Sequence, residues 1–336
     1  MPLETSIRLA SRAYDGVLPI LRGQMTIPGF QLEIVETEDV PGMFAGMFKG
    51  EYDVSEMSLG ELIYYTSRNR AEFIAIPVFP SRMFRHGFLF CRRDSGVERP
   101  SDLSGRKIGF LRWVQTAAIW MRGMLVDEYG VSAEKSHWYA ASMHHWDEHD
   151  PGASVEPRDG SVVRMIENNG KTTSERACRA LFEGQVDALG VTESQMATLM
   201  ANEAVKKLFA DARAVEAAYF RATKILPIMH VLAMRKELIT RHPELPREFF
   251  TLYVQAKHWA QRWRRSLPSL VEAWPNHYLA DEAAIFQCDP WAYGLAANRH
   301  VLDKFFAYCY RQGISGRAIE PEEIFHSSTH GLSESS

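Results

Sequence analysis

The sequence predicts an α/β protein with two lobes, one of which is inserted into the other. Segments typical of strands and of helices alternate in the first third of the chain, and this alternation indicates α/β units. The alternation restarts after Pro100 and continues to about residue 226, where an apolar strand and a run of helices follow. We therefore expect a first lobe from residues 1–95 and 227–336 and a second lobe from residues 96–226.

The first lobe is expected to begin with two strands separated by a helix. "SIRLASR" has the pattern of a short strand, "AYDGVLPILRGQM" has apolar residues at helical spacing, and "FQLEIVETE" alternates apolar and polar residues. "VPGMFAGMFKGEYDVSEMSL" indicates a second helix followed by a short strand around residues 52–56. "EFIAIPVFP" and "HGFLFCRR" are the next two expected strands.

The second lobe is expected to contain the strands "RKIGFL", "HWYAAS" and "VDALGV" and the helices "TAAIWMRGMLVDEYG" and "SERACRALFEG". Between them, residues 143–174 are rich in polar residues, Gly and Pro, which indicates a long loop or hairpin. Four of its side chains, those of His144, His145, Asp147 and His149, are of types that bind metal ions. Their spacing is irregular, so a solvated loop that is rich in His is the favoured interpretation.

Composition and charge indicate an ordinary globular protein. The chain has 336 residues, of which 46% are hydrophobic and 24% charged, and its formal net charge is −4, so no nucleic-acid partner is expected. No apolar run approaches the ~20 residues of a membrane span, and no secretion signal is expected. The cysteines are far apart in the sequence, which predicts reduced thiols in a cytoplasmic protein. Assembly into a homo-oligomer stays open.

Two arginines and a histidine stand where two apolar strands meet, in "PSRMFRH". Arg is seldom buried without a partner, and segments that connect the elements of a rigid scaffold frequently carry function. Arg82, Arg85 and His86 are therefore candidates for a binding site. The alternative is a solvated hairpin tip, at which an arginine pairs with a nearby carboxylate.

Three blocks of the sequence resemble the 4,5-dihydroxyphthalate decarboxylases: "LASRAYDGVLPILRG", "YDVSEMSLGELI" with "FIAIPVFPSRMFRHGFLF", and "PWAYGLAANRHVL". The resemblance covers most of the chain and departs at about residues 139–175. It implies the α/β fold of the type 2 periplasmic binding proteins, with two discontinuous lobes joined by two crossing strands near residues 91–96 and 227–234. A cleft between the lobes would then bind a small aromatic dicarboxylate substrate.

The resemblance also implies a carboxy-lyase of phthalate degradation, which converts 4,5-dihydroxyphthalate into protocatechuate and carbon dioxide. A hydroxyl para to the leaving carboxylate can push electron density onto the ipso carbon, which takes a proton before carbon dioxide departs. The ring is then the electron sink, so no organic cofactor is expected, and a divalent metal stays open. The alternatives are a solute-binding protein for an aromatic or sulfonate anion and another lyase on the same scaffold.

Such chemistry needs cations for a carboxylate and an acid for the ring carbon. Arg binds a carboxylate through two parallel hydrogen bonds, and His delivers protons near neutral pH. Positions at strand ends and helix starts are favoured, because ligands of open α/β sheets lie beyond the carboxyl ends of strands and helix N-termini attract anions. The candidate catalytic residues are His86, His230 and Asp15. The candidate substrate-binding residues are Arg12, Tyr14, Ser58, Arg82, Arg85, Trp113, Gln115 and Thr116.

Several of these candidates have a structural alternative. Capping of a helix is sufficient to explain Asp15 and Ser58, and packing in the core is sufficient to explain Trp113. A His within an apolar strand, such as His230, is also more often a core residue than a proton donor.

Overall fold

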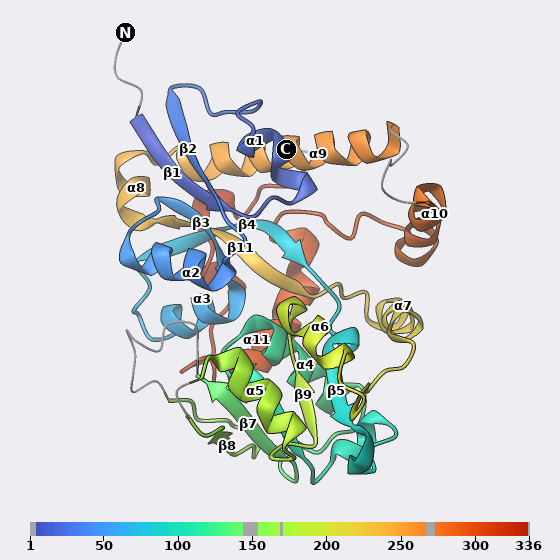
Figure 1. Ribbon diagram of the computed structural model, residues 1–336. Coiled ribbons are helices and arrows are strands. Elements are labelled where there is room, and N and C mark those ends of the chain that lie inside the picture. Colours follow the sequence, from blue (N-terminus) through green and yellow to red (C-terminus); the bar gives the residue numbers. More distant parts are fainter. Residues whose placement is uncertain (1–4, 144–153, 169–170, 267–272, 335–336) are drawn as a thin grey trace.

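The computed structural model describes residues 5–143, 154–168, 171–266 and 273–334, and it shows two α/β lobes that are each built around one β-sheet (Figure 1). The sheet of the first lobe lies in the upper half of Figure 1, and the sheet of the second lobe lies in the lower half. Within these four ranges, no helix is both long enough and apolar enough to cross a membrane.

Five strands in the order β2-β1-β3-β11-β4 form the sheet of the first lobe. β1 is parallel to β2 and β3, and β11 is antiparallel to its neighbours β3 and β4. Because β11 follows the second lobe in the sequence, the first lobe is discontinuous. The strands are β1 Thr5–Ser11, β2 Phe30–Glu36, β3 Val54–Ser58, β4 Phe73–Arg82 and β11 Ile228–Arg235.

Six strands in the order β10-β5-β9-β6-β7-β8 form the sheet of the second lobe. β6 is parallel to β7 and β9, β7 is parallel to β8, and β5 is antiparallel to β9 and β10. The strands are β5 Leu89–Arg92, β6 Lys107–Arg112, β7 His137–Ser142, β8 Val163–Met165, β9 Ala188–Gly190 and β10 Val205–Lys207.

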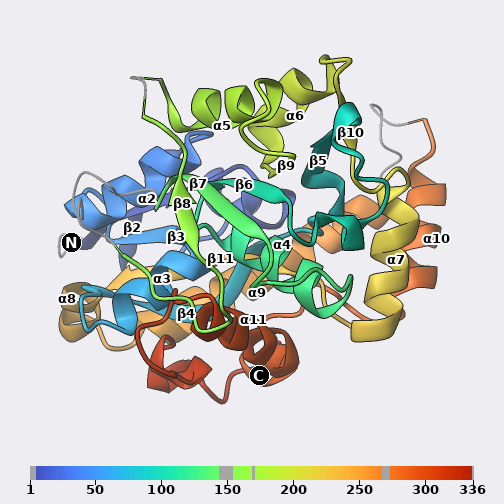
Figure 2. The same ribbon diagram turned by 90° about the horizontal axis from the view of Figure 1, so that it is seen from below.

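Helices pack around both sheets (Figures 1 and 2), and several of them begin at side chains that cap the free backbone N–H groups. Asp39 accepts a hydrogen bond from the backbone N–H of Gly42, and Thr172 forms a reciprocal capping box with Glu175. The helices are α1 Leu18–Leu21, α2 Val40–Lys49, α3 Leu59–Thr66, α4 Thr116–Asp127, α5 Thr173–Phe182, α6 Glu193–Met200, α7 Ala212–Thr223, α8 Lys236–Arg241, α9 Leu245–Ser266, α10 Pro275–Phe286 and α11 Arg299–Arg311.

Two predicted elements differ from the structure for local reasons. The helix expected over residues 13–25 is only a 3₁₀ helix followed by the four-residue α1, and the chain turns after it at Gly23, which has a φ of +67°. The strand expected from His86 begins only at Leu89, because residues His86–Phe88 form a 3₁₀ helix. Since β5 already belongs to the second sheet, the chain crosses between the sheets at residues 83–88, earlier than predicted.

Helix α4 joins the two lobes, and each of residues 116–125 within it is buried (Figure 2). The indole N–H of Trp120 donates to the backbone oxygen of Ile228 in β11 at 3.0 Å. A Cβ at Gly123 would overlap the ring of Tyr308 in α11, so glycine permits the close approach of these two helices. The second lobe is therefore held to the first by packing and hydrogen bonding, in addition to the two crossings of the chain.

Candidate active site

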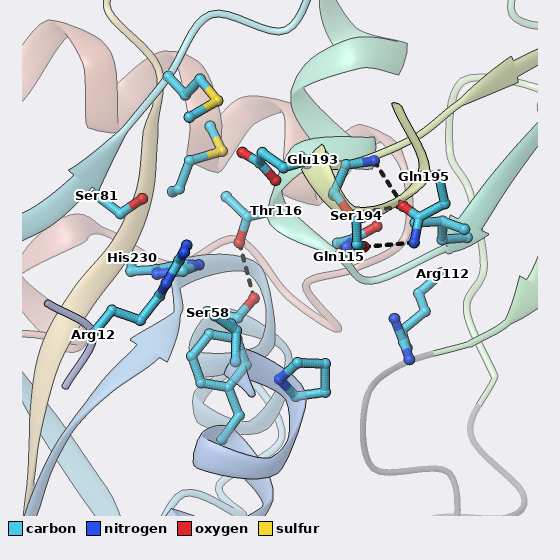
Figure 3. A pocket seen from close by; sticks show the side chains of 18 of the residues that line it. Arg12, Ser58, Ser81, Arg112, Gln115, Thr116, Glu193, Ser194, Gln195 and His230 are labelled. Carbon is cyan, nitrogen blue, oxygen red and sulfur yellow. Dashed lines mark hydrogen bonds between the residues drawn. The ribbon is translucent and has the colours of Figure 1, made fainter. Parts of the chain in front are cut away.

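A cavity of about 270 Å³ lies between the lobes, and both lobes line it (Figure 3). A cavity of about 150 Å³ accommodates benzene, so this one has room for a ring with several substituents. The first lobe and residues 83–88, the crossing segment between the two sheets, contribute Arg12, Tyr14, Glu38, Val40, Pro41, Phe44, Ser58, Ser81, Met83, Arg85, Met229 and His230. The second lobe contributes Leu111, Arg112, Gln115, Thr116, Ala117, Ser174, Thr192, Glu193, Ser194 and Gln195.

The first sheet faces the cavity with the end at which β1 and β3 finish. Arg12 follows the last residue of β1, and Ser58 is the last residue of β3. Because β11 runs antiparallel to β3, the beginning of β11 lies at the same end of the sheet, where His230 pairs in register with Ser58. Residues that are far apart in the sequence therefore form one wall.

A buried carboxylate, that of Glu56, lies behind His230. Its Oε2 is 3.1 Å from the Nδ1 of His230, and its Oε1 accepts hydrogen bonds from the Ser11 hydroxyl at 2.8 Å and the Arg12 backbone N–H at 2.9 Å. The ring of Phe44 stands edge-on to the imidazole, with centroids 5.1 Å apart and planes at 88°. With Nδ1 engaged by Glu56, Nε2 is the ring nitrogen that remains for a ligand.

Two arginines of the cavity pair with carboxylates at its margin. The Nη2 of Arg12 is 2.6 Å from Oε2 of Glu38, and the Nη1 of Arg85 is 3.3 Å from Oε1 of Glu193. Burial lowers the pKa of Arg85, and the charge of Glu193 acts in the opposite direction. The side chains of Glu38 and Glu193 are 70% and 51% exposed, so both carboxylates can be hydrated when an anionic ligand replaces them.

Neutral hydrogen-bonding groups dominate the wall that the second lobe contributes. Helices α4, α5 and α6 begin at this wall, and the positive end of each helix dipole favours a bound anion. The side-chain amide of Gln195 donates to the hydroxyls of Ser174 at 2.9 Å and Ser194 at 2.6 Å, and thereby links α5 to α6. In Figure 3, Gln195 and Ser194 lie across the view from His230.

The two walls meet at Ser58 and Thr116. Their hydroxyl oxygens are 2.9 Å apart, and the hydroxyl of Thr116 also accepts a hydrogen bond from the backbone N–H of Gly60 at 2.9 Å. A Cβ at Gly60 would lie 2.6 Å from the backbone oxygen of Val114, so glycine is required where α3 meets the segment before α4. Both hydroxyls thus line the cavity and connect the lobes.

Most of the predicted site residues lie together in this cavity. Tyr14 lies at the edge of the first sheet, where burial, together with the nearby charge of Glu56, raises the pKa of its phenol. The predicted residues that line the cavity are Arg12, Tyr14, Ser58, Arg85, Gln115, Thr116 and His230.

Arg82 does not line the cavity. Its guanidinium is buried and donates to the backbone oxygen of Ala292 at 2.7 Å and to the amide oxygen of Asn298 at 2.6 Å. Burial lowers the pKa of Arg82 to about 10. Arg82 therefore ties the end of β4 to the segment that precedes α11.

His86 does not line the cavity either. It is fully buried, and the rings of Tyr129, Phe209 and Tyr219 stand edge-on to its imidazole with centroids 5.1–5.6 Å away. Burial lowers the pKa of His86 to about 4, so this imidazole is neutral near pH 7.

Asp15 and Trp113 also lie away from the cavity lining. Asp15 is exposed, in the first turn of a 3₁₀ helix, and accepts a hydrogen bond from the backbone N–H of Gly16 at 2.8 Å. Trp113 is fully buried, donates from its indole to the backbone oxygen of Gln312 at 3.2 Å, and stacks under the guanidinium of Arg122 at 3.6 Å. The local environment of Trp113 is that of a core aromatic residue.

Sequence reasoning assigned no role to several residues that the structure brings to the site or behind it, among them Glu56, Arg112, Ser174 and Gln195. Glu56 carried a signal, because an acidic residue inside a predicted strand is seldom buried without a partner. Arg112, Ser174 and Gln195 line the cavity but carried no signal in the sequence, because only the packing of the second lobe brings them together.

In the part of the chain that the structure describes, no group of three or more His, Cys, Asp or Glu residues is placed to hold a metal ion. The predicted alternative ligands His144, His145, Asp147 and His149 lie outside the described residues.

Comparisons of sequence identify relatives of the chain. A family model described as "ABC transporter, phosphonate, periplasmic substrate-binding protein" matches residues 4–238. A protein of Comamonas testosteroni named 4,5-dihydroxyphthalate decarboxylase is 31% identical over 327 residues, which cover 96% of each chain. A protein of the same name from Pseudomonas putida is 27% identical over 218 residues, which cover 65% of this chain and 82% of that protein.

Solved structures share the fold. The periplasmic aliphatic sulphonate-binding protein SsuA of Escherichia coli superposes with a TM-score of 0.51 at 11% identity, over 96% of this chain and 92% of that chain. The periplasmic sulfonate-binding protein SsuA of Methylobacillus flagellatus gives 0.52 at 16% identity, over 97% and 92%. At these identities the likeness concerns the fold alone, and it confirms the predicted two-lobed, periplasmic-binding-protein-like architecture.

Proposed function

The chain belongs to the 4,5-dihydroxyphthalate decarboxylase family, and on this premise we propose that it converts 4,5-dihydroxyphthalate into protocatechuate and carbon dioxide. The observation that carries the proposal is His230, which lines the cavity while its Nδ1 lies 3.1 Å from the buried carboxylate of Glu56. A protein that only binds an anion needs the cations of the cavity, but it does not need a histidine held in this way.

The two carboxylates of the substrate are assigned to cations from different parts of the cavity. Arg85 exchanges Glu193 for the carboxylate that is retained. The leaving carboxylate is assigned to Arg12, because the backbone N–H of Arg12 and the Nδ1 of His230 both bind Glu56. This orientation brings the ipso carbon toward His230.

The ring hydroxyls are assigned to the neutral wall of the second lobe. The hydroxyls of Ser174 and Ser194 each accept a hydrogen bond from Gln195 and keep an O–H that can donate to a ring oxygen. Such groups distinguish a dihydroxylated ring from unsubstituted phthalate, because an apolar edge would leave them unpaired.

The reaction then needs one proton and no external oxidant or reductant. The phenolate para to the leaving carboxylate donates electron density to the ring, and the Nε2–H of protonated His230 transfers its proton to the ipso carbon, where a C–H bond forms. The C–C bond to the carboxylate then breaks, its electron pair restores the aromatic ring and the phenolate, and carbon dioxide leaves. His230 regains a proton from solvent.

A solute-binding protein for an aromatic or sulfonate anion is the second candidate, and the family model is consistent with it. The two candidates differ in what the protein does with a bound ligand. A binding protein raises its melting temperature with the dicarboxylate and releases the ligand unchanged.

We also propose a cytoplasmic location. Cys91, Cys178, Cys288 and Cys309 are free thiols, and Cys288 is exposed, which fits a reducing compartment. Recovery of the native protein from a periplasmic extract would contradict this location.

The decisive experiment incubates the purified protein with 4,5-dihydroxyphthalate and measures carbon dioxide and protocatechuate. Phthalate and the other dihydroxylated benzene dicarboxylates serve as comparison substrates, each with and without a chelator. In heavy water, the product is expected to carry one deuterium on the carbon that lost its carboxylate. Binding without release of carbon dioxide from any of these compounds would favour the solute-binding protein instead.

A further inference from the structure

Glu56 stands where an apolar residue is expected. It lies in β3, whose five residues are all buried, and its side chain has no exposed surface. The register of the sheet explains how such a position can carry a carboxylate. Glu56 is opposite Leu232 and Ser58 is opposite His230, so these four side chains share one face, and Glu56 is the diagonal neighbour of His230.

The two strands on either side of β3, β1 with the residue that follows it and β11, supply the hydrogen-bond partners of this carboxylate. Ser11 at the end of β1 donates its hydroxyl at 2.8 Å, the backbone N–H of Arg12 donates at 2.9 Å, and His230 of β11 lies at 3.1 Å. Within the described ranges, His230 is also the ion-pair partner of Glu56. Two of these partners, the Ser11 hydroxyl and the Arg12 backbone N–H, are donors, and an ionised carboxylate only accepts hydrogen bonds.

The consequence for His230 concerns which ring nitrogen carries the proton. An acceptor at Nδ1 requires a hydrogen on Nδ1, so in the neutral ring Nε2 carries none and in the charged ring Nε2 carries the single proton that can be transferred. The edge-on contact with Phe44 at 5.1 Å restrains the plane of the ring. The proton therefore enters and leaves the imidazole at one defined atom.

We propose that Glu56 is a positioning residue, which keeps Nδ1 of His230 protonated and thereby makes Nε2 the sole site of proton exchange with a ligand in the cavity. This inference rests on the proposed role of His230 as proton donor. Glu56 itself does not touch the substrate, because its carboxylate is buried behind the imidazole.

The test is Glu56→Gln, which preserves the shape of the side chain but offers an amide N–H₂ that can donate to Nδ1. In the substrate-free wild-type protein, the ¹⁵N chemical shifts of His230 are expected to show Nδ1 protonated. In the variant the proton is expected to move to Nε2. The variant is also expected to lose about 10–100-fold in kcat with KM changed less than about 3-fold, a range typical of residues that orient a functional histidine.

Ser55→Ala is the matched control, because it removes a buried hydroxyl from the same strand, one whose hydrogen bond goes to the backbone oxygen of Glu56. This variant is expected to keep both the tautomer and kcat. Ser11→Ala is the second test variant, since it removes one donor to Glu56 without a change at His230, and it is expected to reduce kcat by less than Glu56→Gln does. If Glu56→Gln does not fold, the kcat of Ser11→Ala tests the proposal in its place. A wild-type kcat in that variant would then contradict the role of Glu56.

The outcomes separate this inference from the proposed function. An unchanged tautomer in Glu56→Gln overturns the role of Glu56, whatever the protein does with 4,5-dihydroxyphthalate. A shifted tautomer with wild-type kcat also overturns it, because proton placement would then not limit turnover. If the wild-type protein releases no carbon dioxide but the tautomer shifts, the proposed function fails while the positioning of His230 by Glu56 stands.

Discussion

Ionisable side chains around the crossing segment occupy two different regions, the cavity wall and the packed interior. In the cavity wall, Arg85 and His230 each have a carboxylate partner, at 3.3 Å and 3.1 Å. In the interior, Arg82 donates to two neutral oxygen atoms, and three aromatic rings surround His86. The two regions thus contain the same residue types at different distances from a carboxylate, since the one nearest His86, that of Glu216, lies 3.9 Å from its Nδ1.

The difference determines which side chains can act on a substrate. A neighbouring carboxylate favours the charged form of a base, whereas burial without one disfavours it. Burial accordingly lowers the pKa of Arg82 to about 10 and that of His86 to about 4. We expect the cavity wall to govern turnover and binding, and the interior to govern stability.

The largest expected effect is on turnover and concerns the two histidines. His230→Ala is expected to lower kcat by about two to four orders of magnitude with little change in KM, because a proton donor acts mainly in the transition state. His86→Gln replaces the histidine of the interior, and the kcat of this variant is expected to stay within about 3-fold of the wild-type value. Steady-state release of carbon dioxide measures both. Equal losses in the two variants would remove the distinction between the regions.

The next effect is on binding and concerns the two arginines. Arg85→Ala is expected to weaken binding of the dicarboxylate by about 2–5 kcal/mol, since a desolvated carboxylate would lose its charged partner. Arg85→Lys is expected to keep only part of the binding free energy that Arg85→Ala loses, because an ammonium group lacks the planar fork of the guanidinium. Isothermal titration calorimetry gives the dissociation constants.

Arg82→Met is the control for Arg85→Ala. It removes a guanidinium that lies outside the cavity lining and leaves an apolar side chain of similar length. Its dissociation constant is expected to match that of the wild type, while its melting temperature falls because two buried hydrogen bonds are lost. Weaker binding of the dicarboxylate by Arg82→Met would indicate that Arg82 contributes to the substrate site after all.

The sequence was sufficient for the fold because the relevant patterns are local. The alternation of apolar and polar residues in β2 can be recognised within its seven residues. The discontinuity of the first lobe could be predicted because the pattern restarts and then returns. Residues at strand ends, such as Arg12 and Ser58, could be predicted for the site because sheets place their ligands there.

The sequence was not sufficient to separate Arg82, Arg85 and His86. These residues lie within five positions of one another, and where each side chain lies depends on how the crossing segment leaves the first sheet. The pairing of β4 with β11 is irregular on both sides of His230, so the simple alternation of a strand does not apply there. The partners of Glu56 could not be predicted either, because they come from β1 and β11, which are distant from β3 in the sequence.

The smallest expected effect is on stability in acid, and it tests the interior region through His86. Its pKa is about 4 in the folded protein and about 6.5 in the unfolded chain, so between these values the unfolded chain binds a proton that the folded protein does not. The free energy of unfolding is therefore expected to fall as the pH falls from about 6.5 to 4, by a total of about 3 kcal/mol from this group. The nearest carboxylate, that of Glu216, lies 3.9 Å from Nδ1, and burial raises its pKa, which gives a contribution of opposite sign.

His86→Gln isolates the contribution of the imidazole, because Glu216, Tyr129 and Tyr219 remain in both proteins. Urea unfolding of the wild type and the variant at several pH values between 7 and 4 gives two stability curves. Wild-type stability is expected to fall more steeply in acid, so that its advantage over the variant shrinks or reverses by pH 4. Parallel curves would mean that the folded protein accommodates a charged His86, and the interior would then share the electrostatic character of the cavity wall.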